Sequence, residues 1–172
     1  MSTNDLFSSE LVPHKKPNRA VLTIFVLVLV LFPVQALANN ISVSNVSVVD
    51  QNTSADTVVI EFDISWSNSW KDSVNNDAAW VFVKYSTDTG NTWNHSTLKN
   101  SGTNPSGYAD GTPSSSAYSA ADIIVPTDKK GCFIQAAHQG SGTFNFTDMQ
   151  IVWDYGADGV SELAQPSGLA LE

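Results

Sequence analysis

Alternation of apolar and polar residues dominates the chain beyond residue 38 and predicts β-strands. The clearest run covers residues 58–66, where every second residue is apolar and those between are mostly polar, as in a strand with one buried face. Its apolar positions are Val58, Ile60, Phe62, Ile64 and Trp66. Residues 41–48 alternate too, but the phase slips by one residue near Asn45. The slip predicts a β-bulge or a break in that strand.

Residues 78–85 are apolar on both faces, which predicts a central strand, and residues 92–98 are its expected hairpin partner. The next stretch, 99–119, is rich in Ser, Gly, Pro and Asn and predicts a long surface loop. The same patterns predict three further strands, at residues 121–125, 132–137 and 143–155.

The expected fold is all-β. Beyond the N-terminal segment no helical period stands out, and about seven short strands separated by turn residues predict an antiparallel β-sandwich. Immunoglobulin-like and jelly-roll-like arrangements both fit this pattern. We expect the sandwich to span residues 39–162. Residues 163–172 lack a clear period and contain Pro166, so they predict a flexible tail.

The N-terminal 38 residues have the layout of a secretory signal peptide. Basic residues including Arg19 precede an apolar run at 20–32, and Ala36-Leu37-Ala38 supplies small residues for cleavage. The run is roughly 13 residues long, short of the about 20 that a membrane-spanning helix needs. We therefore expect cleavage after Ala38 and a secreted, periplasmic or cell-surface protein without a stable membrane span. An uncleaved N-terminal membrane anchor is the alternative.

Charge and cysteine content narrow the possible partners. The formal net charge is −9, and Arg19 is the only arginine. Such a surface repels phosphate backbones, which makes a nucleic-acid partner unexpected. Cys132 is the only cysteine, so an intramolecular disulfide is impossible, and its apolar neighbours predict a buried, inert thiol.

Residues 86–93 match S-x-D-x-G-x-T-W at every fixed position. The match resembles the Asp-box hairpin of sialidases. Its fixed residues are Ser86, Asp88, Gly90, Thr92 and Trp93. A carboxylate that bonds backbone amides, a glycine that takes positive φ and a tryptophan tucked under the turn together stabilise a hairpin. Sialidases repeat the box around a propeller and clamp their substrate with arginines, so this single copy predicts a structural role.

Three further features could carry binding. Trp70 is the best candidate for an exposed ring that stacks on a sugar, with Asp77 nearby in an oxygen-rich turn, whereas Trp66 and Trp80 are expected in the core. Asp154 and Asp158 flank the turn 155–157 and could contribute to a Ca²⁺ site. Turn chemistry explains these oxygen-rich positions equally well, so no cofactor is expected beyond this possible calcium ion.

Four phrases, at residues 39–46, 62–70, 77–85 and 153–160, together resemble one family. It is the N-terminal β-sandwich module of secreted bacterial proteins that carry a formylglycine-generating-enzyme-like (sulfatase-modifying-factor) domain. The most specific phrase is Asp-Ala-Ala-Trp-Val-Phe-Val-Lys-Tyr. The resemblance implies a module without activity of its own. Because the sequence ends at Glu172, it contains none of the catalytic-type domain. A free-standing module and a shortened longer protein both fit.

The leading hypothesis is therefore a non-catalytic, exported β-sandwich that binds a protein or a glycan at or outside the cell surface. One alternative is a subunit that assembles into surface fibres by strand addition, using the nearly uncharged segment 41–48. The other is a small secreted carbohydrate-active enzyme, which needs two carboxylates across a cleft. The absence of a recognisable catalytic motif makes an enzyme the less expected outcome.

Overall fold

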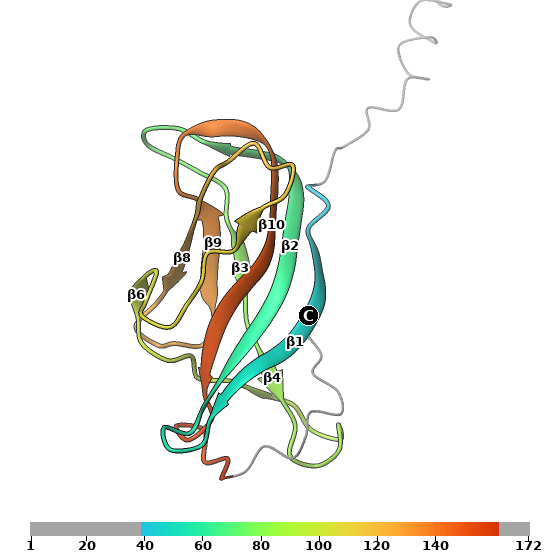
Figure 1. Cartoon of the computed structure of the whole chain (residues 1–172), viewed down its shortest axis with the longest axis vertical. Coiled ribbons are helices and arrows are strands. Elements are labelled where there is room, and N and C mark those ends of the chain that lie inside the picture. Colours follow the sequence, from blue (N-terminus) through green and yellow to red (C-terminus); the bar gives the residue numbers. More distant parts are fainter. Residues whose placement is uncertain (1–38, 162–172) are drawn as a thin grey trace, which may run out of the picture. The chain divides into compact units, whose positions relative to one another are not determined.

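The computed structural model describes residues 39–161, and within this range the chain forms ten strands and no helix (Figure 1). The all-β prediction is confirmed. The predicted signal peptide at 1–38 and the predicted tail at 163–172 lie outside the described residues. Within the described range no helix is long and apolar enough to cross a membrane.

The first sheet is built on two long antiparallel strands. They are β2 (Thr57–Lys71) and β10 (Gly140–Asp154), paired from Lys71 opposite Gly140 to Thr57 opposite Asp154. Strand β1 (Ser42–Asn52) pairs with the other edge of β2, and the short β7 (Thr112–Pro113) pairs with β10. The order is β1-β2-β10-β7, and Figure 1 shows the three long strands side by side.

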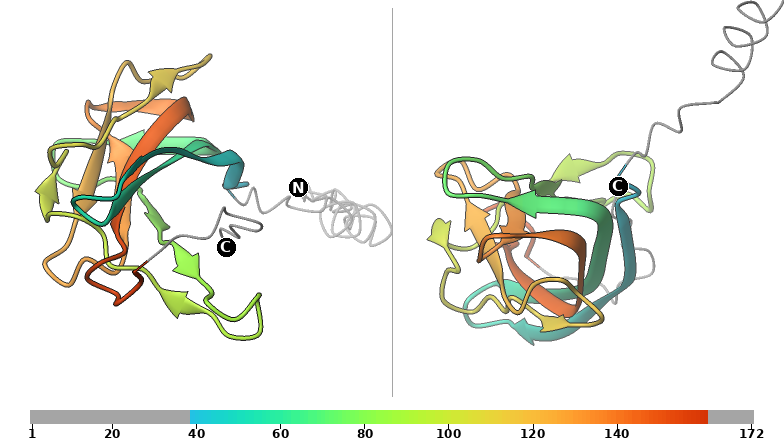
Figure 2. Two further views of the ribbon diagram at one scale, coloured as in Figure 1. Left: turned by 60° about the horizontal axis from the view of Figure 1, so that its bottom comes forward. Right: turned by 90° about the horizontal axis from the view of Figure 1, so that it is seen from above.

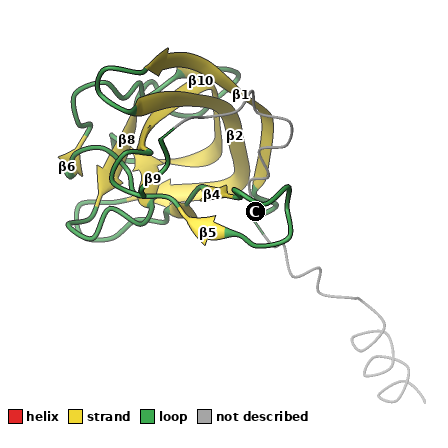
Figure 3. Cartoon of the chain, turned by 90° about the horizontal axis from the view of Figure 1, so that it is seen from below, coloured by secondary structure: helices red, strands yellow, loops and turns green. Residues whose placement is uncertain are grey.

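The second sheet has the order β3-β9-β8-β6. Its strands are β3 (Ala79–Val81), β9 (Cys132–Ala136), β8 (Ala121–Val125) and β6 (Gly102–Thr103). A separate two-stranded ribbon joins β4 (Lys84–Tyr85) to β5 (Asn94–His95), which confirms the predicted hairpin between these segments. Figure 2 shows the long strands curling around the interior, and Figure 3 shows β4 and β5 beside them.

The core fills the space between the two sheets. The alternating apolar face of β2 is buried throughout, and β8 and β9 bury Ile123 and Ile134 from the opposite side. Trp66 stacks on Phe144 of β10 with ring centroids 3.9 Å apart. Both rings are at most 3% exposed, so the Trp66 prediction is confirmed. Cys132 is also buried, as expected, and burial raises its thiol pKa to about 12.

The prediction of a central strand at 78–85 is wrong. β3 ends at Val81 and lies at the edge of its sheet, and β4 begins only at Lys84. The placement of Trp80 in the core is also wrong, since this side chain is 42% exposed. Both errors have one cause. Trp80 and Phe82 make the segment apolar on its second face as well, but they pack on other exposed rings rather than on the core.

The predicted loop at 99–119 is more ordered than its composition indicates. It contains β6 and β7, and it follows the edge of β10 by backbone hydrogen bonds. The amides of Ala109, Ser114 and Ala117 donate to carbonyl oxygens of β10 at distances of 3.1, 3.0 and 2.8 Å. The irregularity near Asn45 is confirmed as a bulge, because the β1–β2 register shifts there and Asn45 has a φ of 52°.

Phe144 tests the core directly. Replacing it with Ala removes the ring that stacks on Trp66, and we expect the free energy of unfolding to fall by about 3–5 kcal/mol. The measurement is equilibrium urea unfolding. Val74→Ala, at a side chain that is 82% exposed, is the control and should change stability by no more than about 0.5 kcal/mol. Equal losses for the two variants would contradict this packing.

Candidate functional site

The second sheet exposes two aromatic rings on its outer face. Trp80 of β3 and Phe133 of β9 are register partners, and their ring centroids lie 4.6 Å apart. Each side chain is 42% exposed. Their strand neighbours, among them Ala79 and Ile134, are buried, so the alternation of each strand directs the two rings away from the core. We refer to Trp80 and Phe133 as the aromatic platform.

A glycine allows the platform to lie close to the backbone. Gly131 precedes β9, and a Cβ atom added there would lie 2.6 Å from Cζ2 of Trp80 and 2.8 Å from the carbonyl oxygen of Val81. No side chain fits at such distances. The indole of Trp80 therefore covers Gly131, and this contact restricts the position of the ring.

The platform continues across the sheet and along the chain. In register, Phe133 pairs with Ile124 of β8, which pairs in turn with Thr103 of β6. On the other side, Phe82 follows Trp80 by two residues and packs against His95 with ring centroids 5.0 Å apart. The register therefore places Trp80, Phe133, Ile124 and Thr103 in one band across the outer face of this sheet.

Polar side chains form a parallel row beside this band. Gln135 lies two residues beyond Phe133 on the same face of β9, and its register partner is Asp122. Nδ2 of Asn76 donates to Oε1 of Gln135 at 2.7 Å and to the carbonyl oxygen of Asp77 at 2.9 Å. We refer to Asn76 and Gln135 as the amide pair. Asp122 accepts from Asn104 at 3.2 Å and lies 3.8 Å from Nζ of Lys71.

Trp70 and Asp77, the predicted ligand-binding residues, lie close together, but Asp77 has a structural role. Its carboxylate accepts from the indole N–H of Trp66 at 2.9 Å, from Oγ of Ser69 at 2.9 Å and from the backbone N–H of Trp70 at 3.2 Å. These bonds close the turn after β2. Trp70 is 43% exposed, which keeps it available as a stacking ring.

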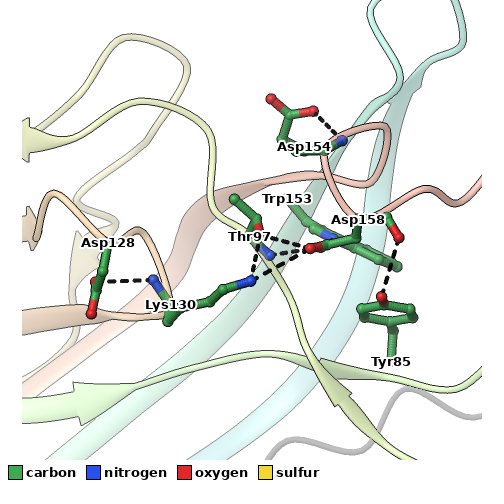
Figure 4. Close-up of polar contacts among 8 residues, drawn as sticks. Tyr85, Thr97, Asp128, Lys130, Trp153, Asp154 and Asp158 are labelled. Atoms are coloured by element: carbon green, nitrogen blue, oxygen red, sulfur yellow. Dashed lines mark hydrogen bonds and ion pairs between the residues drawn. The ribbon is translucent and has the colours of Figure 1, made fainter.

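Asp158, predicted as a metal ligand, is surrounded by protein donors (Figure 4). Its carboxylate accepts from the backbone N–H of Thr97 at 2.7 Å, from Oγ1 of Thr97 at 2.6 Å and from the indole N–H of Trp153 at 2.7 Å. Nζ of Lys130 lies 3.5 Å away. Burial raises the pKa of Asp158, but these bonds and the charge of Lys130 outweigh it, so the pKa lies below 3.8.

Asp154, the second predicted metal ligand, is engaged separately. It forms an ion pair with Lys99 at 3.3 Å and accepts from the backbone N–H of Ala157 at 3.2 Å. Among the described residues no group of three or more His, Cys, Asp or Glu side chains is placed to hold a metal ion. A calcium ion at this turn would have to displace the cations and amides that the two carboxylates already bind. The calcium site stays a prediction.

The hairpin motif forms the hydrogen bonds that its sequence predicts. Asp88 accepts from the backbone N–H of Thr92 at 2.8 Å and from its Oγ1 at 2.7 Å, and Oγ of Ser86 accepts from the N–H of Gly90 at 2.8 Å. Gly90 has a φ of 88°, and the ring of Trp93 lies near it but is 41% exposed rather than tucked away. The bonds from Thr92 hold the pKa of Asp88 at about 2. The motif therefore has a complete structural explanation.

Sequence reasoning missed the platform and the amide pair. An exposed ring and a core ring both read as apolar, so the pattern gave no signal for Trp80 or Phe133. One signal was available: Gly131 stands directly before a strand, where glycine often marks a close approach of another group. Asn76 and Gln135 are 59 residues apart, and only the fold brings them together.

Comparisons with known proteins leave the family open. The chain matches no protein-family model, no curated protein and no solved structure. The resemblance to modules of formylglycine-generating-enzyme-like proteins therefore stays a prediction. A function has to be inferred from the geometry of the aromatic platform, the amide pair and the two carboxylate sites.

Asp158→Ala tests the structural role of this carboxylate. The change leaves the N–H groups of Thr97 and Trp153 without their acceptor and removes the ion pair with Lys130, so we expect the free energy of unfolding to fall by about 2–4 kcal/mol. Urea unfolding at neutral pH is the measurement, and Asp110→Ala, at an exposed carboxylate, is the control. A midpoint unchanged from that of the natural chain would show that the bonds around Asp158 contribute little.

The pH dependence of stability gives an independent test. Because the folded-state pKa of Asp158 lies below its ordinary value of 3.8, its contribution is present above that value and is lost as pH falls through the folded-state pKa. We expect stability to drop below about pH 4 and the drop to be smaller in Asp158→Ala. Unfolding curves from pH 2 to 7 measure both. Parallel profiles for the two proteins would contradict the assignment.

Proposed function

We propose that this chain is a non-catalytic, exported β-sandwich module that binds a glycan on the aromatic platform. The observation that carries the proposal is the exposed pair Trp80–Phe133, beside polar groups that are already held in place. A pyranose ring has an apolar face of C–H groups and an edge of oxygen atoms. An aromatic ring can stack on the apolar face, and side-chain amides can hydrogen-bond to the oxygen atoms of the edge.

The size of the platform favours a glycan over a protein partner. A fully buried aromatic side chain removes about 150–250 Å² from water. Two rings therefore fall well short of the about 800 Å² that each partner contributes to a standard protein–protein interface. Two rings do suffice to cover one or two sugar units. The net charge of −9 also favours an uncharged partner over an anionic one.

The two alternatives have weaker support. β1 is an edge strand of eleven residues, which favours strand addition, but register shifts interrupt it at two places. Bulges of this kind are a common protection of sheet edges against pairing with another chain. For an enzyme, the obvious carboxylates are Asp154 and Asp158, and both are engaged by protein cations and N–H groups. We therefore keep the binding module as the proposal.

Trp80→Ala is the decisive variant. Losing the larger ring should weaken binding to the preferred glycan at least about tenfold, because central aromatic residues dominate such contacts. Trp93→Ala is the matched control, since this tryptophan is 41% exposed but lies on the hairpin. Trp70→Ala tests the ring expected from sequence. Affinity electrophoresis against cellulose derivatives, glycol chitin, xylan and curdlan measures all three.

The outcomes separate the candidate surfaces. Loss of glycan binding in Trp80→Ala, with full binding in Trp93→Ala and Trp70→Ala, supports the platform. Loss only in Trp70→Ala would move the site to the end of β2. Equal binding by all variants, or no retardation of the natural protein by any of these polysaccharides, would overturn the proposal. Urea unfolding of each variant verifies that a loss of binding is not a loss of fold.

A further inference from the structure

The orientation of the Gln135 amide is determined by a backbone carbonyl. Nδ2 of Asn76 lies 2.9 Å from the carbonyl oxygen of Asp77, which can only accept a hydrogen bond. The nitrogen of Asn76 must therefore face this oxygen. The same nitrogen lies 2.7 Å from Gln135, which must then present its own oxygen, Oε1, to Asn76. This chain of donors and acceptors leaves Gln135 one amide orientation.

The consequence is a fixed donor beside the aromatic platform. Because Oε1 of Gln135 faces Asn76, the Nε2 group of Gln135 is directed away from Asn76. No acceptor among the described residues takes a hydrogen bond from this nitrogen. Gln135 is two residues from Phe133 on the same face, a spacing of about 6–7 Å along a strand. A sugar that stacks on the platform and extends along β9 would therefore come within reach of the two N–H donors of Nε2.

A fixed donor selects among ligand groups by their hydrogen-bonding polarity. A hydroxyl both donates and accepts, so it fits either orientation of an amide. A group that can only accept, such as an amide carbonyl or a carboxylate, binds here only because the Gln135 amide presents Nε2 and not Oε1. A carboxylate is disfavoured, because Asp122 is the register partner of Gln135 and the chain carries a net charge of −9.

We propose that the glycan bound on the aromatic platform is an N-acetylated amino sugar whose acetamide carbonyl accepts a hydrogen bond from Nε2 of Gln135. Asn76 is a positioning residue that sets the polarity of this contact. The inference rests on the proposed function and adds the substrate class to it.

Two oligosaccharides with the same linkage test the acetamide directly. The β-1,4-linked hexamer of N-acetylglucosamine carries the carbonyl, and cellohexaose has a hydroxyl in its place. We expect the natural protein to bind the first at least about tenfold more tightly by isothermal titration calorimetry, because the acetamide carbonyl extends farther from the sugar ring than the hydroxyl and so gains a hydrogen bond from Nε2 that the hydroxyl does not reach. Gln135→Leu should remove this preference while changing the affinity for cellohexaose by no more than about twofold. Gln51→Leu, at an exposed glutamine of β1, is the control.

Asn76→Asp tests the orientation without touching the ligand. A carboxylate at this position accepts from Nε2 of Gln135, which turns Oε1 toward the sugar and removes the donor. The variant also loses the hydrogen bond to the carbonyl oxygen of Asp77, so urea unfolding has to show that the turn stays folded. We expect this variant to lose the preference as fully as Gln135→Leu does, and the double variant to be no weaker than Gln135→Leu alone. Both probes are uncharged, so the added charge does not act on them directly.

The results distinguish this inference from the proposed function. If Trp80→Ala abolishes binding but Gln135→Leu keeps the preference for the acetylated hexamer, the platform stands and the acetamide contact is wrong. If the natural protein binds both hexamers equally, or does not bind the acetylated one, the inference is also overturned. If Trp80→Ala binds as the natural protein does, the proposed function itself fails.

Discussion

The antiparallel pairing of β2 with β10 is the constraint on which the rest of the structure depends. Each strand has fifteen residues, and they pair from Thr57 opposite Asp154 to Lys71 opposite Gly140, with two register shifts along the way. Their inner faces supply most of the large buried side chains of the first sheet. β1 uses the free edge of β2, and the segment 109–117 uses the free edge of β10. Once this pair is formed, the second sheet has a surface to cover.

Two buried tryptophans explain why the conspicuous carboxylates are structural. Trp66 and Trp153 are each 3% exposed, so their indole N–H groups must find acceptors inside the protein. Asp77 accepts from the first and Asp158 from the second. Each carboxylate lies in a turn and also accepts from another segment, from β2 for Asp77 and from Thr97 for Asp158, and in this way ties its turn to the core. An unsatisfied buried N–H costs about 1–3 kcal/mol, which is why these aspartates serve the fold.

The outer face of the second sheet is different, because its aromatic rings are not needed by the core. Ala79 and Val81 fill the inner side of β3, so Trp80 can remain exposed and lie over Gly131. The turn that Asp77 closes also presents Asn76 to Gln135. The hydrogen bonds of Asp77 thus complete the core and also position Asn76 beside the proposed binding surface.

Local patterns were sufficient for most of the longer strands, whereas the edge strand β3, the short strands β6 and β7 and the site depended on long-range contacts. The alternation at 58–66, the strand at 121–125 and the hairpin bonds of Asp88 follow from residues close in sequence, because strand period and turn chemistry are local properties. Whether an apolar residue faces the core or solvent depends on what packs against it, which is why Trp80 was misplaced. Thr97, which bonds Asp158, and Asn76, which orients Gln135, lie 61 and 59 residues from their partners, so only the tertiary structure decided these contacts.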